Sequence, residues 1–178
     1  LNITSEIRTG YIRNNYLAIA PDDKQLAFGS SSYGVFDLFN SPDKFEQPIT
    51  ITANEPGGAC DIFYSDDGSL IAVVSTKKTN VIDSRTGEII KEFENGYYGI
   101  TSFSSLGAFS KNKKLLVFYG VHNVNYQSVP KVVCYNLATG AKVWEKEGEL
   151  SDFRFTNNDQ TIVCIRKSGN TAIVTLNA

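Results

Sequence analysis

The sequence has no methionine, one histidine, one tryptophan and three cysteines among 178 residues. Because His122 is the sole histidine, a multi-histidine metal site is excluded, and a Ser-His-Asp or Cys-His catalytic group would have to use it. The cysteines, Cys60, Cys134 and Cys164, are odd in number and widely spaced, which argues against a disulfide framework or a zinc site. We expect three free thiols among apolar neighbours and therefore a reducing compartment.

Long apolar runs are also missing. No segment approaches the ~20 apolar residues that span a bilayer, and the N-terminus lacks the basic and apolar regions of a signal peptide. The formal net charge of -2 argues against nucleic acid as the main partner. We therefore expect a cytoplasmic protein. Because the chain does not begin with methionine, we also expect a processed product or a piece of a longer protein.

Polar turns recur along the chain at nearly constant spacing. The first residues of successive turns lie 44, 45 and 46 positions apart, and the turns are Pro21–Lys24, Ser65–Gly68, Ser110–Lys113 and Thr156–Asp159. A β-prone run such as Leu70–Val74 follows each turn. Asp, Asn, Ser and Gly favour such turns because they tolerate left-handed backbone or bond it locally. The pattern predicts four β-hairpins.

A second turn recurs in the same unit. Val81–Gly87 matches Cys134–Gly140, and in each segment an Asp or Asn stands four residues before a glycine. A side-chain oxygen at that position can accept N–H bonds from the turn, and glycine supplies a positive φ. We therefore interpret Asp83 and Asn136 as turn-forming residues before any functional role.

A repeat of about 45 residues made of four short strands is typical of a β-propeller blade. The segments Ser65–Ala72 (SDDGSLIA) and Val81–Glu88 (VIDSRTGE) resemble WD40-like repeats in the broad sense, which includes YVTN- and quinoprotein-type propellers. Two features depart from the strict WD40 pattern: no Gly-His pair precedes a repeat, and Ile82 stands before Asp83 in place of Trp. The fold expected is all-β, a β-propeller of four-stranded antiparallel blades, about four of them in this chain.

The predicted domain is one propeller or propeller fragment over 1–178. Its repeat units are expected at about 16–58, 59–99, 100–149 and 150–178. Residues 1–7 are predicted to form a strand of an adjoining or closing blade, and the last unit stops after its third strand. A piece of a larger propeller is favoured, with a closed four-bladed ring and a self-associated form as alternatives.

Terminal blades of an open arc would expose apolar faces. The residues expected there are Leu17, Ile19, Phe28 and Phe36 in the first unit and Phe153, Phe155, Ile162 and Ile165 in the last.

Segments that interrupt the repeat are candidates for function, because loops carry function on such scaffolds. Gly120–Pro130 replaces a turn of about four residues and is predicted to be an inserted loop containing His122 and Tyr126. Tyr97 and Tyr98 stand in the link between the second and third units, on an end face, and Tyr is favoured in binding hot spots. We interpret His122 as an exposed loop residue rather than a catalytic or metal-binding one.

Two carboxylates, Asp61 and Asp152, are predicted to occupy equivalent positions in the first strands of their units, where Leu17 and Leu106 stand in the others. Such strands line the central channel of a propeller, so this pair is a candidate site for a cation or a basic peptide. The alternative is that each carboxylate accepts a hydrogen bond from a nearby backbone N–H.

The functional interpretation that these patterns favour is a non-enzymatic scaffold of WD40-like type. It would bind a protein partner, the remainder of a parent propeller or a second copy of itself. No catalytic, metal or cofactor residues are assigned, and the candidate interaction residues are Tyr97, Tyr98, His122, Tyr126, Asp61 and Asp152. The alternative is the propeller portion of an enzyme, quinoprotein dehydrogenase-like or peptidase-associated, because Ala138–Trp144 (ATGAKVW) looks like a quinoprotein-type repeat.

Overall fold

The computed structural model describes ten segments of the chain: residues 15–30, 35–40, 49–52, 59–75, 78–94, 107–124, 127–148, 150–156, 158–166 and 171–175. Every regular element in these segments is a β-strand, and the strands form four antiparallel sheets. None of the described residues belongs to a helix with the length and apolar character needed to span a bilayer.

Each sheet is a meander in which consecutive strands pair. The first sheet contains β1 (Asn15–Ile19), β2 (Gln25–Ser30), β3 (Val35–Asn40) and β4 (Ile49–Thr52). The second contains β5 (Ala59–Tyr64), β6 (Leu70–Ser75), β7 (Lys78–Asp83) and β8 (Ile89–Glu94). The third contains β9 (Gly107–Phe109), β10 (Leu115–Val124), β11 (Gln127–Asn136) and β12 (Lys142–Glu147). The fourth contains β13 (Leu150–Phe155), β14 (Thr161–Arg166) and β15 (Thr171–Thr175).

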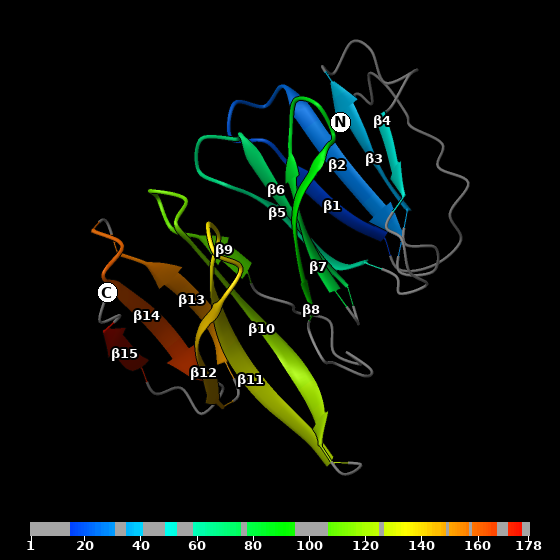
Figure 1. Ribbon diagram of the computed structural model, residues 1–178. Helices are drawn as coiled ribbons and strands as arrows, with labels where there is room; N and C mark the ends of the chain where they lie inside the picture. Colours follow the sequence, from blue (N-terminus) through cyan, green and yellow to red (C-terminus); the bar gives the residue numbers. More distant parts are fainter. Residues whose placement is uncertain are drawn as a thin grey trace, which may run out of the picture.

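The four sheets follow one another in chain order as the blades of a β-propeller (Figure 1). Their first strands form the inner row: β5 contacts both β1 and β9, and β13 contacts β9. The prediction of an all-β propeller with four-stranded antiparallel blades is confirmed, with three strands described in the fourth blade. The strand predicted at 1–7 lies outside the described residues.

The hydrophobic core consists of three layers, one between each pair of neighbouring blades. The layer between the first and second blades contains the buried residues Ala27, Phe36, Leu38, Ile51, Ile62, Ile71, Val73 and Ile82. The layer between the second and third contains Ala72, Val74, Val81, Phe93, Phe109, Leu116, Phe118, Val133 and Tyr135. The layer between the third and fourth contains Val117, Tyr119, Val132, Cys134, Phe153, Ile162 and Cys164.

Strand β6 shows why the sequence of a middle blade is apolar at consecutive positions. Ile71 and Val73 pack toward the first blade, whereas Ala72 and Val74 pack toward the third. Successive side chains of a strand point to opposite faces, so a strand covered on both faces needs apolar residues throughout. Burial of one such side chain contributes ~1.5–3 kcal/mol. The second and third blades are therefore stabilised from both sides.

The faces that point away from the other blades are less apolar than predicted. Leu17 and Ile19 in β1 are 58% and 57% exposed, and Ile165 in β14 is 44% exposed, as the sequence led us to expect. The expectation was wrong for three other residues, Phe36, Phe153 and Ile162, which are at most 1% exposed. They lie on the opposite faces of the same sheets, where neighbouring blades cover them.

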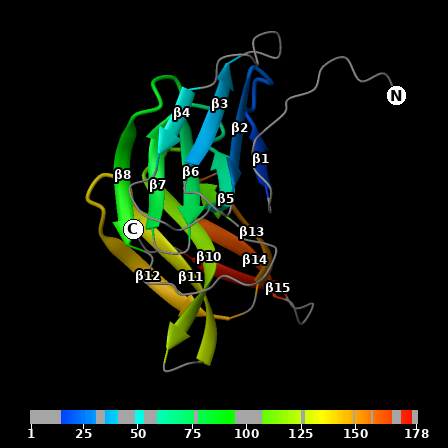
Figure 2. The same cartoon turned by 90° about the vertical axis from the view of Figure 1, so that its right-hand side faces the viewer.

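The prediction of an inserted loop at Gly120–Pro130 was also wrong. Strands β10 and β11 have ten residues each, and their pairing continues without a break to Val124 opposite Gln127. The extra residues therefore lengthen a hairpin. In two views at right angles this hairpin projects beyond the rest of its sheet (Figures 1 and 2).

The second turn of each middle blade has the predicted structure. Asp83 Oδ1 accepts the N–H groups of Arg85 and Thr86, each at 2.9 Å, and Asn136 Oδ1 accepts the two equivalent N–H groups at 3.0 Å. Gly87 and Gly140 follow with φ of 75° and 76°. The interpretation of Asp83 and Asn136 as turn formers is confirmed. These hydrogen bonds, led by the one from Thr86, lower the pKa of Asp83.

We expect the two turn glycines to respond differently to alanine. Both substitutions place a Cβ in left-handed backbone, which costs about 1 kcal/mol. At Gly87 the Cβ would also lie 2.9 Å from Ile49 Cγ2 and 3.2 Å from Ile51 Cδ1, whereas at Gly140 it meets only the end of the flexible Lys91 side chain. Gly87→Ala should therefore lower the unfolding free energy by about 1 kcal/mol more than Gly140→Ala in urea titrations. Equal losses would contradict this packing.

Candidate functional site

The four turns that join the first and second strands of the blades have one geometry, and we call them the first turns. In each, the N–H of the fourth residue donates to the carbonyl of the first at 2.8–3.0 Å, and the fourth residue has a φ between 55° and 71°. The first and fourth residues of the successive turns are Ala20 and Asp23, Ser65 and Gly68, Ser110 and Lys113, and Thr156 and Asp159.

This geometry corrects the sequence alignment of the first unit by one residue. Ala20, not Pro21, corresponds to Ser65, because both accept the turn hydrogen bond. In consequence the first-blade counterpart of Asp61 is Tyr16 and not Leu17. Strand pairing gives the same result, since Tyr16 lies opposite Gly29 as Asp61 lies opposite Val74.

The third residue of each first turn closes the turn from within. Asp67 Oδ1 accepts the hydroxyl of Ser65 at 2.8 Å and the N–H of Ser69 at 3.1 Å. Asn112 and Asn158 accept the hydroxyl of their own turns at 2.9 and 2.6 Å. Such local side-chain bonds are the reason that Asp, Asn, Ser and Thr stabilise tight turns. The prediction that these residues form turns is confirmed.

In the second, third and fourth blades, the fourth residue of the first turn faces the first turn of the preceding blade. Lys113 Nζ donates to Asp67 Oδ2 at 2.6 Å, and the carboxylate of Asp159 accepts the N–H groups of Lys111 and Asn112, both at 2.7 Å. These contacts connect turns 46 to 48 residues apart in sequence. We call this row of contacts the turn seam.

Gly68 occupies the same position in the second blade. A Cβ added to it would lie 3.4 Å from Cδ of Pro21 in the first turn of the first blade. The second blade therefore meets its predecessor by close approach of small groups, whereas the later blades use an ion pair and charged hydrogen bonds.

The electrostatics of the seam centre on Asp67. The hydrogen bond from Lys113 holds the pKa of that carboxyl far below its ordinary value, against a smaller opposing effect of burial. Its side chain is half exposed, so water and salt screen the pair and its contribution to stability is that of a surface ion pair.

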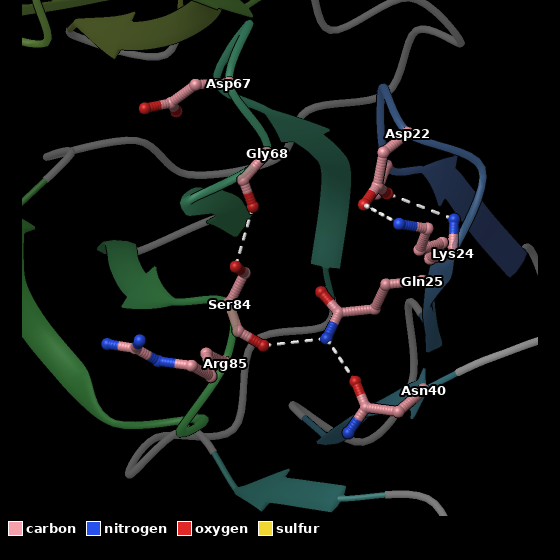
Figure 3. Close-up of a pocket in the computed structure, with 9 residues that line it drawn as sticks. Asp22, Lys24, Gln25, Asn40, Asp67, Gly68, Ser84 and Arg85 are labelled. Atoms are coloured by element: carbon pink, nitrogen blue, oxygen red, sulfur yellow. Dashed lines mark hydrogen bonds and ion pairs between the residues drawn. The ribbon is translucent and has the colours of Figure 1, made fainter.

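A cavity of about 410 Å³ opens beside the seam between the first and second blades (Figure 3). Gln25 is its central polar group. Its Nε2 donates to Asn40 Oδ1 at 2.6 Å and to the Ser84 carbonyl at 2.7 Å, while its Oε1 accepts the hydroxyl of Tyr64 at 3.0 Å. The bonds to the Ser84 carbonyl and from the Tyr64 hydroxyl join the first blade to the second, whereas the bond to Asn40 lies within the first blade.

Two charged pairs line the rim of the same cavity. Lys24 Nζ lies 3.9 Å from Asp22 Oδ2, and Lys113 Nζ donates to Asp67 Oδ2 at 2.6 Å. The guanidinium of Arg85 points away from Gln25 (Figure 3). The residues lining the cavity are Ala20, Asp22, Lys24, Gln25, Asn40, Asp67, Gly68, Ser84 and Arg85. Because its polar groups largely satisfy one another, the cavity serves first as a joint between blades.

Burial also raises two pKa values near the core. The pKa of the Tyr64 hydroxyl is raised above its ordinary value, mainly by burial and also by the charge of Asp22. The pKa of the Cys134 thiol is raised to about 12 by burial, and both Cys134 and Cys164 are buried among apolar neighbours as predicted. The side chain of Cys60 lies outside the described residues.

The two predicted channel carboxylates do not lie on neighbouring blades. Asp61 is in the second blade and Asp152 in the fourth, and each follows an irregularity in strand pairing. Each Oδ1 accepts the N–H of the next residue, at 2.9 Å for Asp61 and 2.8 Å for Asp152. Asp152 also accepts Arg154 Nη1 at 2.6 Å. The backbone bond expected as the alternative is present at both, and cation binding stays a prediction.

The other predicted interaction residues can be placed only in part. His122 lies in strand β10 opposite Val129, so its assignment to a loop was wrong. Tyr97, Tyr98 and Tyr126 lie outside the described residues. Within the described ranges no group of three or more His, Cys, Asp and Glu side chains is placed to hold a metal ion.

Sequence reasoning missed the residues of the turn seam. Asp23, Gly68, Lys113 and Asp159 represent three residue types at one turn position, so no sequence motif marks them. Their signal is spacing: they lie 45, 45 and 46 positions apart, each three residues after the start of a correctly aligned turn.

The ion pair of the seam gives a pH-dependent prediction. In Asp67→Asn, the amide oxygen can still accept the hydroxyl of Ser65, as Asn112 accepts that of Ser110 in the next blade. The substitution removes only the negative charge that faces Lys113. Because the folded pKa of Asp67 is below the unfolded value, its stabilisation is full above about pH 4 and is lost as the pH falls further. We expect a loss of ~0.5–1 kcal/mol at pH 7 in urea titrations. That loss should shrink by pH 3.

Asp66→Asn is the matched control, because Asp66 is exposed in the same turn and has no ion pair in the described structure. It should leave stability nearly unchanged at both pH values. An Asp67→Asn loss of equal size at pH 7 and pH 3 would contradict the ion-pair assignment.

Comparison with known proteins supports the fold and goes no further. No family model matches the chain, and no curated protein matches it. Among solved structures, it is similar to Kuenenia stuttgartiensis hydrazine synthase, a propeller-type protein, with a TM-score of 0.63 and 18% identity. The match covers 91% of this chain and 54% of the other, so this chain spans about half the length of that protein. At this identity the likeness shows the β-propeller fold alone.

Proposed function

We propose that this propeller is a non-enzymatic, WD40-like scaffold for a protein partner, and that the lengthened hairpin is its contact surface. The hairpin arm consists of residues 120–124 of β10 and 127–130 of β11. The observation that carries the proposal is the reach of this arm past both neighbouring strands. Among the described residues, β9 pairs with β10 only from Leu116 to Phe118, and β12 pairs with β11 only from Lys131 to Tyr135.

The arm therefore has two strand edges without a neighbouring strand among the described residues. A two-stranded ribbon alone is marginally stable in water, so packing of the blade does not explain its length. Unpaired strand edges bind extended segments of other proteins through main-chain hydrogen bonds. The arm thus supplies the kind of surface that adds a strand from a partner.

The two edges of the arm are not equivalent. On β11, the carbonyl of Pro130 already accepts the N–H of Gly148 at 2.9 Å, and proline has no N–H to offer. On β10, the carbonyl of Leu115 accepts the N–H of Ser110, so odd-numbered residues point their polar groups to the β9 side. By this alternation Val121 and Asn123 present N–H and C=O groups at the open edge. We infer that the partner strand adds along β10.

A second candidate function is the propeller portion of an enzyme. Two observations support this alternative. The similar solved structure is a hydrazine synthase, and Ala138–Trp144 looks like a quinoprotein-type repeat. Purified protein should distinguish the two. The scaffold proposal expects no quinone absorbance and no bound metal in an elemental assay, whereas a stoichiometric chromophore or metal would favour the enzyme.

The open edge of β10 predicts the effect of one backbone substitution. Peptides are first selected from a display library against the wild-type protein. Their affinity for the Asn123→Ala variant should equal their affinity for the wild-type protein, because alanine keeps the backbone N–H. Asn123→Pro removes that N–H and blocks the edge without breaking the ladder to β11. We expect its affinity for the same peptides, measured by calorimetry, to fall about tenfold or more.

Thermal melting checks that both variants fold. Position 123 lies beyond the residues at which β9 and β12 pair with the hairpin, so we expect both variants to fold. Equal affinity of the selected peptides for all three proteins would overturn binding at this edge. Failure to select any peptide would argue against an extended-segment partner.

A further inference from the structure

The first blade presents a face that lacks a neighbouring blade in the described structure. Leu17 and Ile19 alternate with Tyr16 and Ala18, which pack against the second blade. The outward side chains of β1 are therefore apolar and more than half exposed. Large exposed apolar side chains gathered on one strand mark an interaction surface.

A polar feature of the same blade points to the kind of partner. Asp23 is the fourth residue of its first turn, the position from which Gly68, Lys113 and Asp159 meet the preceding blade. Asp159 is its closest analogue, because it has the same side chain and a φ of 57° against 59°. Asp159 accepts two N–H groups of the third blade's turn. The Asp23 carboxylate has no partner among the described residues.

The fourth blade carries a turn of the kind that Asp159 contacts. In its first turn the N–H of Asp159 donates to the Thr156 carbonyl at 3.0 Å, and the hydroxyl of Thr156 donates to Asn158 at 2.6 Å. The third blade has the same two bonds between Ser110, Asn112 and Lys113. The N–H of Asn158 thus corresponds to that of Asn112, which Asp159 accepts.

The outward face of the fourth blade is also suited to cover another blade. Ile165 is 44% exposed there, on the face opposite the one on which Phe153 and Cys164 pack against the third blade. Arg154 is exposed on the same outward face, where its guanidinium donates to Asp152 at 2.6 Å. The two outward faces are thus similar in apolar character, and the first turn of the first blade adds the carboxylate of Asp23.

We propose that the outward face of the first blade binds the outward face of the fourth blade of a second copy of this chain. Asp23 then accepts the N–H of Asn158 in the fourth blade's first turn of the other copy, as Asp159 accepts the N–H of Asn112 within the chain. Two copies related by a two-fold axis form this junction twice and close a ring of eight blades. Rings of 4–8 blades are the usual range for propellers, and a closed ring leaves no open face. This pairing uses a surface other than the hairpin arm.

Light scattering after size-exclusion chromatography tests the pairing. The wild-type chain should have a mass of about 39 kDa, twice its 19.6 kDa, independent of concentration in the micromolar range. The double variant Leu17→Glu, Ile19→Glu should be monomeric, because each junction would then bury two charges. Both positions are exposed in the single chain, so its fold should not change.

Asp23→Lys tests the polar contact separately. Lysine is compatible with this backbone, since Lys113 has a φ of 55° at the equivalent position. Each junction loses a charged acceptor, which should raise the dissociation constant of the dimer about tenfold. Because the dimer contains two such junctions, the total increase should be about a hundredfold. Ile90→Glu is the matched control, because Ile90 is 50% exposed but lies on β8 of the second blade. It should leave the dimer unchanged.

Three outcomes would overturn the proposal. A wild-type monomer at all concentrations would show that these faces do not pair, and a mass that grows with concentration would exclude a closed ring. A dimer that survives the double substitution would place the interface elsewhere. The Asn123→Pro variant should remain dimeric, so failure of the partner-binding proposal is distinguishable from failure of this one.

Discussion

The structure depends on one constraint: a blade has two faces, and each face is buried only by another blade. The three core layers of the described structure all lie between sheets, and each contains side chains from two neighbouring blades. In the layer between the first and second blades, for example, Phe36 comes from the first blade and Ile71 from the second. A single meander would leave the apolar side chains of both of its faces in water. Stability is therefore a property of neighbouring pairs of blades, as in other repeat proteins.

Apolar layers of this kind hold sheets together but do not fix one sheet's position along another, because the hydrophobic effect is non-directional. The turn seam supplies the missing direction. Hydrogen bonds from Lys113 and to Asp159 have lengths of 2.6 and 2.7 Å, and the Gln25 amide adds a bridge at the first junction. Each contact requires a particular alignment of two turns. The polar end of the propeller thus sets the geometry at which the apolar layers pack.

Local features of the fold were predictable from sequence because they depend on residues close together in the chain. Asp83 and Gly87 form their turn within five residues, and Leu70–Val74 shows burial on both faces by its own composition. The hairpin arm was missed because Gly120–Pro130 has the polar, glycine- and proline-containing composition of a loop. Pro130 is tolerated in a strand there because its nitrogen points to an edge where no strand pairs.

Contacts between blades were not predictable, because they join residues more than 40 positions apart. Lys113 shares its turn with Lys111 and Lys114, and nothing near it in the sequence indicates that it pairs with Asp67, 46 positions away. The assignment of Leu17 as the counterpart of Asp61 failed because Ala20 lacks the hydroxyl that marks the start of the other turns. A one-residue error on a strand moves a side chain to the opposite face, so its consequences were large.

The chemistry of the seam differs at every junction, and this difference has a use. The blades resemble one another, so a blade could pack against the wrong neighbour if all junctions were alike. Close approach at Gly68 and Pro21, an ion pair at Lys113 and Asp67, and backbone bonds at Asp159 are mutually poor substitutes. Asp159 facing the first turn of the second blade would meet the carboxylate of Asp67, whereas in the third blade it accepts the N–H groups of Lys111 and Asn112. Specificity of this kind disfavours wrong pairings as well as stabilising the right one. The seam therefore adds directional contacts to the junctions between blades, which the non-directional apolar layers lack.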